Sequence, residues 1–78
     1  MELGKKIAQI RTSKGMTQTY VASQLDKTSQ WLSNIEKGRR GIGAIELYQI
    51  AKILGVSVGS FFDDDLNVTL KPTGTEGV

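Results

Sequence analysis

Apolar residues recur at helical spacing along most of the chain, in short segments that turn-forming residues separate. Leu3, Ile7 and Ile10 lie at positions i, i+4 and i+7, which predicts a helix from about residue 3 to residue 13. The same period predicts four further helices, over residues 17–25, 28–37, 44–54 and 57–62. Segments this short have to pack against one another to be stable. The pattern therefore predicts a compact all-α domain of five helices.

The composition excludes several classes of site. The chain has 78 residues, enough for one small domain, and contains neither cysteine nor histidine. Disulfides and Cys/His zinc sites are thus excluded, and we expect no metal and no cofactor. No apolar stretch is long enough to span a membrane, and no secretory signal is visible. We therefore expect a cytoplasmic protein.

The net charge of +2 is unevenly distributed along the chain. Residues 1–62 carry nine Lys and Arg against four acidic residues, a balance of +5, whereas residues 63–78 carry four acidic residues against one Lys. A basic body with an acidic tail is compatible with a partner that is a polyanion, although many solvated helical surfaces are equally basic. We divide the chain into a domain of residues 1–62 and a tail of residues 63–78.

The tail has a different pattern from the domain. Leu66, Val68 and Leu70 alternate with polar residues, which predicts a short strand over residues 66–71. Such a strand could pair with its copy in a second subunit, and the alternative is a flexible tail with dimerisation around Phe61 and Phe62 or only on the bound polyanion. The Gly- and Thr-rich residues 72–78 are expected to be disordered.

Two of the predicted helices are joined by a very short turn, Asp26-Lys27. This spacing is typical of a helix-turn-helix, in which the second helix enters the major groove of DNA. On a helical wheel, Leu32, Ile35 and Glu36 fall on the inner side of that second helix. The opposite side collects short polar side chains and one cation, Gln30, Ser33, Asn34 and Lys37. Amides and hydroxyls of this kind suit base edges, although an ordinary solvated face is the alternative.

From residue 7 to residue 62 the sequence resembles the phage Cro/repressor-like family, also called Xre-type, of helix-turn-helix transcriptional regulators. The resemblance rests on five segments, Ile10-Arg11, Gly15-Met16-Thr17-Gln18, Val21-Ala22, Ser29-Gln30-Trp31-Leu32-Ser33-Asn34-Ile35-Glu36-Lys37-Gly38 and Ile50-Ala51-Lys52-Ile53-Leu54-Gly55-Val56-Ser57. It implies the all-α repressor fold and binding of double-stranded DNA. It does not identify the DNA sequence that is bound.

The resemblance also implies roles for individual residues. In the second helix of the motif, called the recognition helix, the residues expected to read bases are Ser29, Gln30, Ser33 and Asn34. Gln18, at the start of the preceding helix, is expected to contact a phosphate, unless it is only a good helix former. The other expected contacts to the DNA backbone are Thr28, Trp31, Lys37, Arg39 and Arg40. A basic loop that is merely solvated is the alternative for the two arginines.

Two further positions have structural interpretations. Arg11 and Glu36 match a salt bridge of the family between the first and third helices, so we expect them to orient the recognition helix. An unpaired carboxylate on the inner side of that helix would be costly. Trp31 lies on the flank of the helix, where it either covers the edge of the core or contacts a sugar-phosphate strand or thymine methyl group.

The chain also departs from the family pattern. Asp26 stands where the family usually has glycine in the turn, and a left-handed backbone there is tolerable for Asp but costs more than for Gly. Ile42-Gly43 replaces the Pro-Ser that often opens the fourth helix, so we expect a more mobile loop.

We therefore predict a sequence-specific transcriptional regulator, a repressor that binds a palindromic operator as a homodimer. The alternative is a protein-interaction module with the same fold, such as an antitoxin or antagonist, which binds a protein partner through its tail. An enzyme is not expected, because the chain has no Cys or His for a nucleophile–base arrangement. The adjacent carboxylates Asp63, Asp64 and Asp65 cannot converge on one metal ion.

Overall fold

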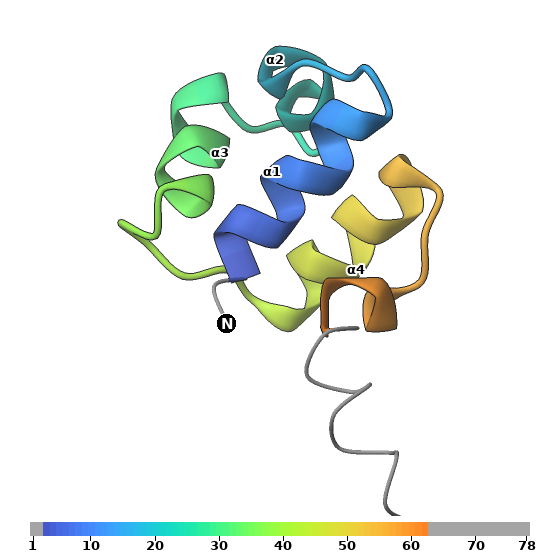
Figure 1. The fold of residues 1–78 in the computed structure, drawn as a ribbon. Coiled ribbons are helices and arrows are strands. Elements are labelled where there is room, and N and C mark those ends of the chain that lie inside the picture. Colours follow the sequence, from blue (N-terminus) through green and yellow to red (C-terminus); the bar gives the residue numbers. More distant parts are fainter. Residues whose placement is uncertain (1–2, 63–78) are drawn as a thin grey trace, which may run out of the picture.

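The computed structural model describes residues 3–62, which form four α-helices and a final 3-10 helix, with no strand among them. The elements are α1 (Leu3–Ser13), α2 (Gln18–Ser23), α3 (Ser29–Glu36), α4 (Ala44–Leu54) and η1 (Val58–Phe62). α1 runs through the middle, with α3 on one side and α4 on the other (Figure 1). The predicted all-α helix-turn-helix fold is confirmed. The predicted strand and disordered end lie outside the described residues.

The helices begin where side-chain chemistry favours a helix start. The hydroxyl oxygens of Thr17 and Thr28 accept hydrogen bonds from the backbone N–H groups of Tyr20 and Trp31, at 3.0 and 3.1 Å. These bonds satisfy donors that the first helical turn leaves without partners. At the start of α4, the carboxylate of Glu46 accepts a hydrogen bond from the backbone N–H of Gly43. The expected helix starts are thus present in the structure.

The turn between α2 and α3 begins earlier than predicted. α2 ends at Ser23 rather than Leu25, and the backbone N–H of Lys27 bonds to the carbonyl of Ala22 at 2.9 Å. Asp26 adopts the left-handed conformation, with φ of 58°, as expected for this position. Aspartate tolerates this conformation better than most residues. The chain therefore makes the tight turn without glycine.

The last predicted helix is a short 3-10 helix rather than an α-helix. Phe61 of this helix is completely buried and Phe62 is partly buried. The element η1 packs against α1 and α4. The Phe61 ring is therefore unavailable to a second subunit, because it already belongs to the core of its own domain, whereas dimerisation around Phe62 stays a prediction. Burial of a phenylalanine explains why so short a segment is held in place.

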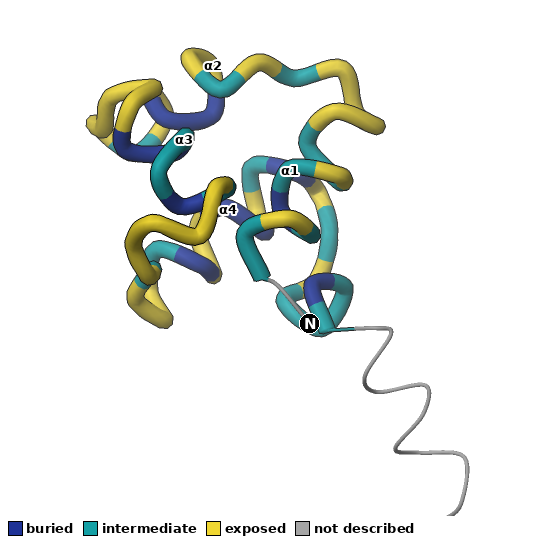
Figure 2. Tube along the Cα trace, turned by 60° about the vertical axis from the view of Figure 1, so that its left-hand side comes forward, coloured by how far each residue is buried: buried dark blue, intermediate teal, exposed yellow. Residues whose placement is uncertain are grey.

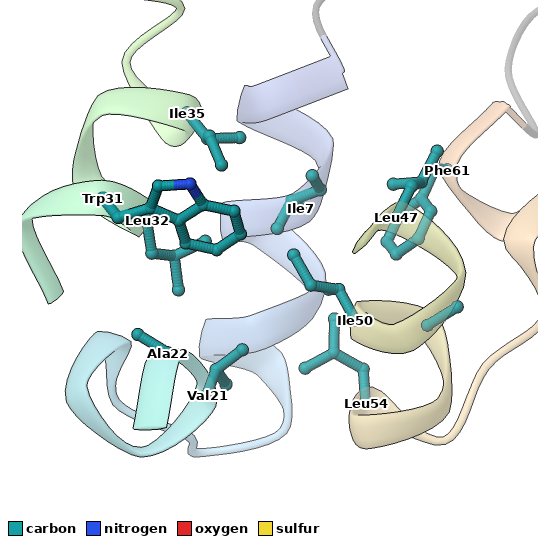
Figure 3. Close-up of a cluster of buried hydrophobic side chains, with 11 residues drawn as sticks. Ile7, Val21, Ala22, Trp31, Leu32, Ile35, Leu47, Ile50, Leu54 and Phe61 are labelled. Atoms are coloured by element: carbon teal, nitrogen blue, oxygen red, sulfur yellow. The ribbon is translucent and has the colours of Figure 1, made fainter. Parts of the chain in front are cut away.

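One core joins all five elements. Figure 3 shows side chains from α1, α2, α3, α4 and η1 converging on a single cluster. Its buried members are Ile7, Val21, Ala22, Trp31, Leu32, Ile35, Leu47, Ile50, Ala51, Leu54 and Phe61. Buried residues line the inner sides of the helices, and exposed residues cover the outer sides (Figure 2). The helical period seen in the sequence thus corresponds to a real division between core and surface.

A close approach of backbones fixes α1 against the end of α3. A Cβ atom added to Gly4 would overlap the carbonyl oxygen of Ile35 and lie 3.0 Å from the Cα atom of Glu36. Only glycine therefore fits at this point of α1. No role for Gly4 could be predicted from the sequence, because the requirement for glycine comes from a neighbour that is distant in the chain.

Replacing Gly4 with alanine should lower the free energy of unfolding by about 1–3 kcal/mol, because the added methyl group forces α1 away from α3. In an exposed helix the same replacement stabilises by roughly 1 kcal/mol, so the sign of the change is diagnostic. Gly41→Ala is the control, because nothing lies within 4 Å of that site. Urea denaturation measures both variants. A Gly4→Ala protein at least as stable as the wild type would contradict the close contact.

Candidate nucleic-acid interface

The outer face of α3 presents the four side chains that were predicted to read bases. Ser29 and Gln30 are exposed, and Ser33 and Asn34 are partly exposed. They come from successive turns of one helix whose opposite side, at Leu32, is completely buried. The helix therefore offers hydroxyl and amide groups to solvent while its inner side anchors it. This is the chemistry that hydrogen-bonds to base edges in a major groove.

Two of these side chains also contact each other. The amide nitrogen of Gln30 donates a hydrogen bond to the side-chain oxygen of Asn34, at 3.1 Å. Residues four apart on a helix lie on the same face, so this contact is favoured by helix geometry. Gln30 and Asn34 thus form one amide pair at the centre of the exposed face.

A basic loop follows directly after α3. Lys37, Arg39 and Arg40 are all exposed. The backbone N–H groups of both arginines bond to the carbonyl of Asn34, at 2.8 and 3.4 Å, and Gly38 turns the chain with φ of 77°. The loop is therefore folded back onto the end of α3. Its backbone thus lies next to Asn34, and contacts of its cations to the DNA backbone stay a prediction.

Trp31 lies in the core rather than on the flank of α3, with only 8% of its surface exposed. Its ring is covered by two cations, the Lys27 Nζ at 5.5 Å and the Arg40 Cζ at 5.9 Å from the ring centroid. Cations favour the negative face of an aromatic ring. Of the two interpretations of Trp31, the structure agrees with the one in which the ring covers the core. The ring also connects the turn before α3 with the loop after it.

No role could be predicted for Lys27 from the sequence, in which it was only part of a turn. In the structure its Nζ lies 3.6 Å from a carboxylate oxygen of Glu46, at the start of α4, as well as over the Trp31 ring. No spacing rule links these residues, because the contacts depend on how α3 and α4 are packed. Lys27 thus joins the turn of the motif to α4.

The carboxylate of Glu36, at the end of α3, is almost shielded from water, with 6% of the side chain exposed. The guanidinium of Arg11 donates two hydrogen bonds to it, from Nε at 2.7 Å and from Nη2 at 3.1 Å. The third guanidinium nitrogen donates to the carbonyl of Met16 at 2.7 Å. This paired geometry is the strongest that Arg and carboxylate form. It connects α1, the turn before α2, and α3.

Gln18 connects α2 to this arrangement. Its amide nitrogen donates a hydrogen bond to the same Glu36 carboxylate, at 2.8 Å. One side chain of α3 therefore receives bonds from α1 and from α2. Gln18 was expected to contact a phosphate, and its bond to Glu36 could not be predicted from the sequence. An amide nitrogen has two N–H groups, so one remains for an outside acceptor.

The charges of the described residues favour binding of an anion beside the basic loop, residues 37–40. Two of their carboxylates are already engaged by cations, Glu36 with Arg11 and Glu46 with Lys27. Along residues 37–40 the charges are all positive.

Within residues 3–62 no three acidic side chains gather into a potential metal site. No helix in this range is long and apolar enough to cross a membrane.

Removing either Arg11 or Glu36 should cost roughly 3–5 kcal/mol of stability, because the remaining charge is left poorly compensated inside the domain. Denaturation of Arg11→Ala, Glu36→Ala and the double variant measures the coupling, and the double variant should lose less than the sum of the single losses. Additive losses would show that the two side chains do not interact.

Glu46→Gln is the control for that cycle. The Lys27–Glu46 pair is longer, at 3.6 Å, and both side chains are substantially exposed. Exposed ion pairs contribute about 0–1 kcal/mol, so we expect a small loss.

Comparisons with known proteins identify the family of the chain. The sequence pattern of the helix-turn-helix family matches residues 7–61. The chain is 42% identical over 55 residues to y4dJ, an uncharacterized HTH-type transcriptional regulator of Sinorhizobium fredii, which covers 70% of this chain and 71% of the relative. It is 36% identical over 61 residues to the control protein C.BamHI of Bacillus amyloliquefaciens, 77% of this chain and 75% of the relative.

A further relative is longer. The chain is 38% identical over 65 residues to y4wC, another uncharacterized HTH-type transcriptional regulator of Sinorhizobium fredii, and the match covers 83% of this chain but 46% of the relative. The chain thus spans about half the length of that protein. The matched family pattern covers all four α-helices except the first turn of α1. The chain belongs to the Cro/repressor-like, or Xre-type, helix-turn-helix family of transcriptional regulators.

Proposed function

We propose that this protein is a repressor that binds a specific sequence of double-stranded DNA by placing α3 in the major groove. The observation that carries the proposal is the exposed face of α3, where amides and hydroxyls stand beside a basic loop. Short polar side chains discriminate between base pairs, whereas cations add affinity without discrimination. Relatives that are HTH-type regulators and control proteins support a role in transcription.

The proposed contacts divide into two groups. Ser29, Gln30, Ser33 and Asn34 read base edges. Contacts to phosphates come from five residues around them, Gln18, Thr28, Lys37, Arg39 and Arg40. Gln18 would use the N–H that Glu36 leaves free. Trp31 acts indirectly in this proposal, because its buried ring holds Arg40 and the loop rather than touching DNA.

Replacing Arg39 or Arg40 with alanine should weaken binding to all DNA sequences alike and flatten the salt dependence of the binding constant by about one unit of slope for each lost phosphate contact. Fluorescence titrations with specific and random duplexes over a range of salt concentrations measure both effects.

Lys52→Ala is the control with the same change of charge, because Lys52 is in the last turn of α4 and contacts the Tyr48 ring. We expect it to leave the salt slope nearly unchanged. An equal effect of Lys52→Ala would mean that only net charge matters, which would contradict contacts by the loop.

We further propose that the protein acts as a homodimer in the cytoplasm. One recognition helix reads only a few base pairs, which is too little to find one site among genomic competitors. Two copies related by a two-fold axis read half-sites about one helical turn, ~34 Å, apart. The alternating apolar residues of segment 66–71 are a candidate for pairing between the copies.

Selection of bound duplexes from a random pool should therefore yield a palindromic consensus. Sedimentation of the full chain and of a chain that ends at residue 63 tests the role of the tail. A consensus without symmetry would contradict the dimer. A dimer that persists after truncation would show that segment 66–71 does not form the interface, while the proposal of a homodimer would still hold.

The second candidate function is binding of a protein partner, as in an antitoxin or antagonist. Two exposed apolar side chains on α4 favour it, Ile45 with 76% and Tyr48 with 56% of their surface exposed. They lie one helical turn apart, and large apolar residues exposed together often mark contact surfaces. Titration with DNA separates the candidates, because a module that binds only a protein shows no DNA binding with the steep salt slope that phosphate contacts produce.

A further inference from the structure

A cavity of about 350 Å³ lies between the first turn of α1 and the loop that follows α3. Figure 1 shows this loop passing beside the start of α1 before the chain enters α4. Small-molecule sites have volumes of about 300–1,000 Å³, so the cavity is large enough for a small organic ligand. The four residues proposed to read bases are not among the described residues that line it. The cavity is therefore a separate feature of the surface.

One wall of the cavity is apolar. Its side chains are Leu3, Ile35 and Ile42, and each of them is buried or partly buried against the core. Gly38 and Gly41 also line the cavity, and a Cβ atom added to either would meet no other atom within 4 Å. The space beside the loop is thus open, and its apolar wall is held in place by the core. An apolar group placed there would be removed from water, which favours binding.

The charged residues that line the cavity are Lys37 and Arg40, and none of the other described lining residues is acidic. Among residues 3–62, the ammonium group of Lys37 has no hydrogen-bond or ion-pair partner. The Nε atom of Arg40 donates a hydrogen bond to the carbonyl of Gly41 at 3.3 Å, which places the guanidinium beside the cavity. The Nη groups of Arg40 bond to no other described residue. Both cations are therefore available to an anion.

We propose that this cavity binds a small organic carboxylate with an apolar body, and that the bound ligand excludes DNA. The apolar body packs against Leu3, Ile35 and Ile42. The carboxylate binds Lys37 and Arg40, because ionised donors form strong hydrogen bonds with carboxylates. The exclusion of DNA rests on the proposed function, in which the same two cations contact phosphates. Cations that are engaged by a ligand cannot also neutralise a phosphate, so each partner weakens binding of the other.

Nuclear magnetic resonance of the full chain without DNA tests the site by itself. The probe is phenylacetate, and the signals followed are the backbone amides of Gly4, Gly38 and Gly41. We expect saturable shifts with a dissociation constant in the millimolar range, which suits a ligand of about ten non-hydrogen atoms. Phenylacetamide has no charge and should bind at least about threefold more weakly. Acetate has no apolar body and should give no saturable shifts at the same concentrations.

Two variants test the two parts of the site. Lys37→Gln should weaken binding of phenylacetate about two- to fivefold, as expected for loss of one exposed ion pair, and leave phenylacetamide unaffected. Ile42→Ser should weaken binding of both compounds, because part of the apolar wall is lost. Lys52→Gln is the control, because it makes the same change of charge in the last turn of α4, outside the lining of the cavity. Thermal melts establish that each variant is folded.

The affinity for the selected duplex, with and without phenylacetate, tests the exclusion of DNA. At a probe concentration of about ten times its dissociation constant, exclusive binding raises the apparent dissociation constant for DNA about elevenfold. Sodium acetate at the same concentration is the control for ionic strength, because salt alone weakens DNA binding. Ile42→Ser keeps both cations, so it should bind DNA like the wild type while phenylacetate has a smaller effect on it.

Four results would overturn the inference. Without saturable shifts from phenylacetate, the cavity is not a site for this class of ligand. Shifts spread over all exposed lysines would show a general effect of the anion. Equal binding of phenylacetamide would show that the cations do not bind the carboxylate. Binding in the cavity with unchanged DNA affinity would contradict the exclusion of DNA. If the chain binds no duplex, the proposed function fails and the exclusion of DNA fails with it, whereas the shifts at the glycines still decide whether the cavity binds the carboxylate.

Discussion

The carboxylate of Glu36 is the point on which the arrangement of the first three helices depends. It lies at the end of α3, shielded from water, and receives hydrogen bonds from Arg11 of α1 and Gln18 of α2. A buried charge is tolerated only when it is paired and its remaining positions are bonded, so these contacts have a strict geometry. Arg11 extends the same constraint to the turn before α2 through the Met16 carbonyl. The direction of α3 relative to the other two helices is therefore set by directional bonds as well as by apolar packing.

The rest of the structure adds to this constraint from both ends of α3. Near its last turn, Gly4 allows the backbones of α1 and α3 to touch. In its first turn, Trp31 fills the core and its ring is covered by Lys27 and Arg40, which come from the turn before the helix and the loop after it. Because these contacts hold α3 by its inner side, its outer side can carry polar groups that do not contribute to packing. A rigid helix with an exposed amide face is the arrangement that loses little entropy when it binds DNA.

Much of this architecture could be predicted from the sequence because it depends on local chemistry. The helix starts at Thr17 and Thr28 and the left-handed turn at Asp26 follow from the hydrogen bonding and backbone preferences of single residues. The amide face of α3 follows from helical periodicity. The choice between the two interpretations of Trp31 could not be made from the sequence, because it depends on packing between elements. The bond from Gln18 to Glu36 and the contacts of Lys27 could not be predicted for the same reason. Gly4 is the plainest example, since its requirement arises from a carbonyl 31 positions away in the sequence.

We propose that these constraints turn the outer face of α3 toward the bases of DNA. The most direct measurement is nuclear magnetic resonance of the full chain during titration with its selected duplex, following backbone and side-chain amide signals. We predict large shifts of the side-chain amides of Gln30 and Asn34 and of the backbone of residues 37–40, with little change at Tyr48 on α4. Shifts concentrated on α4, with the Gln30 and Asn34 amides unaffected, would contradict it.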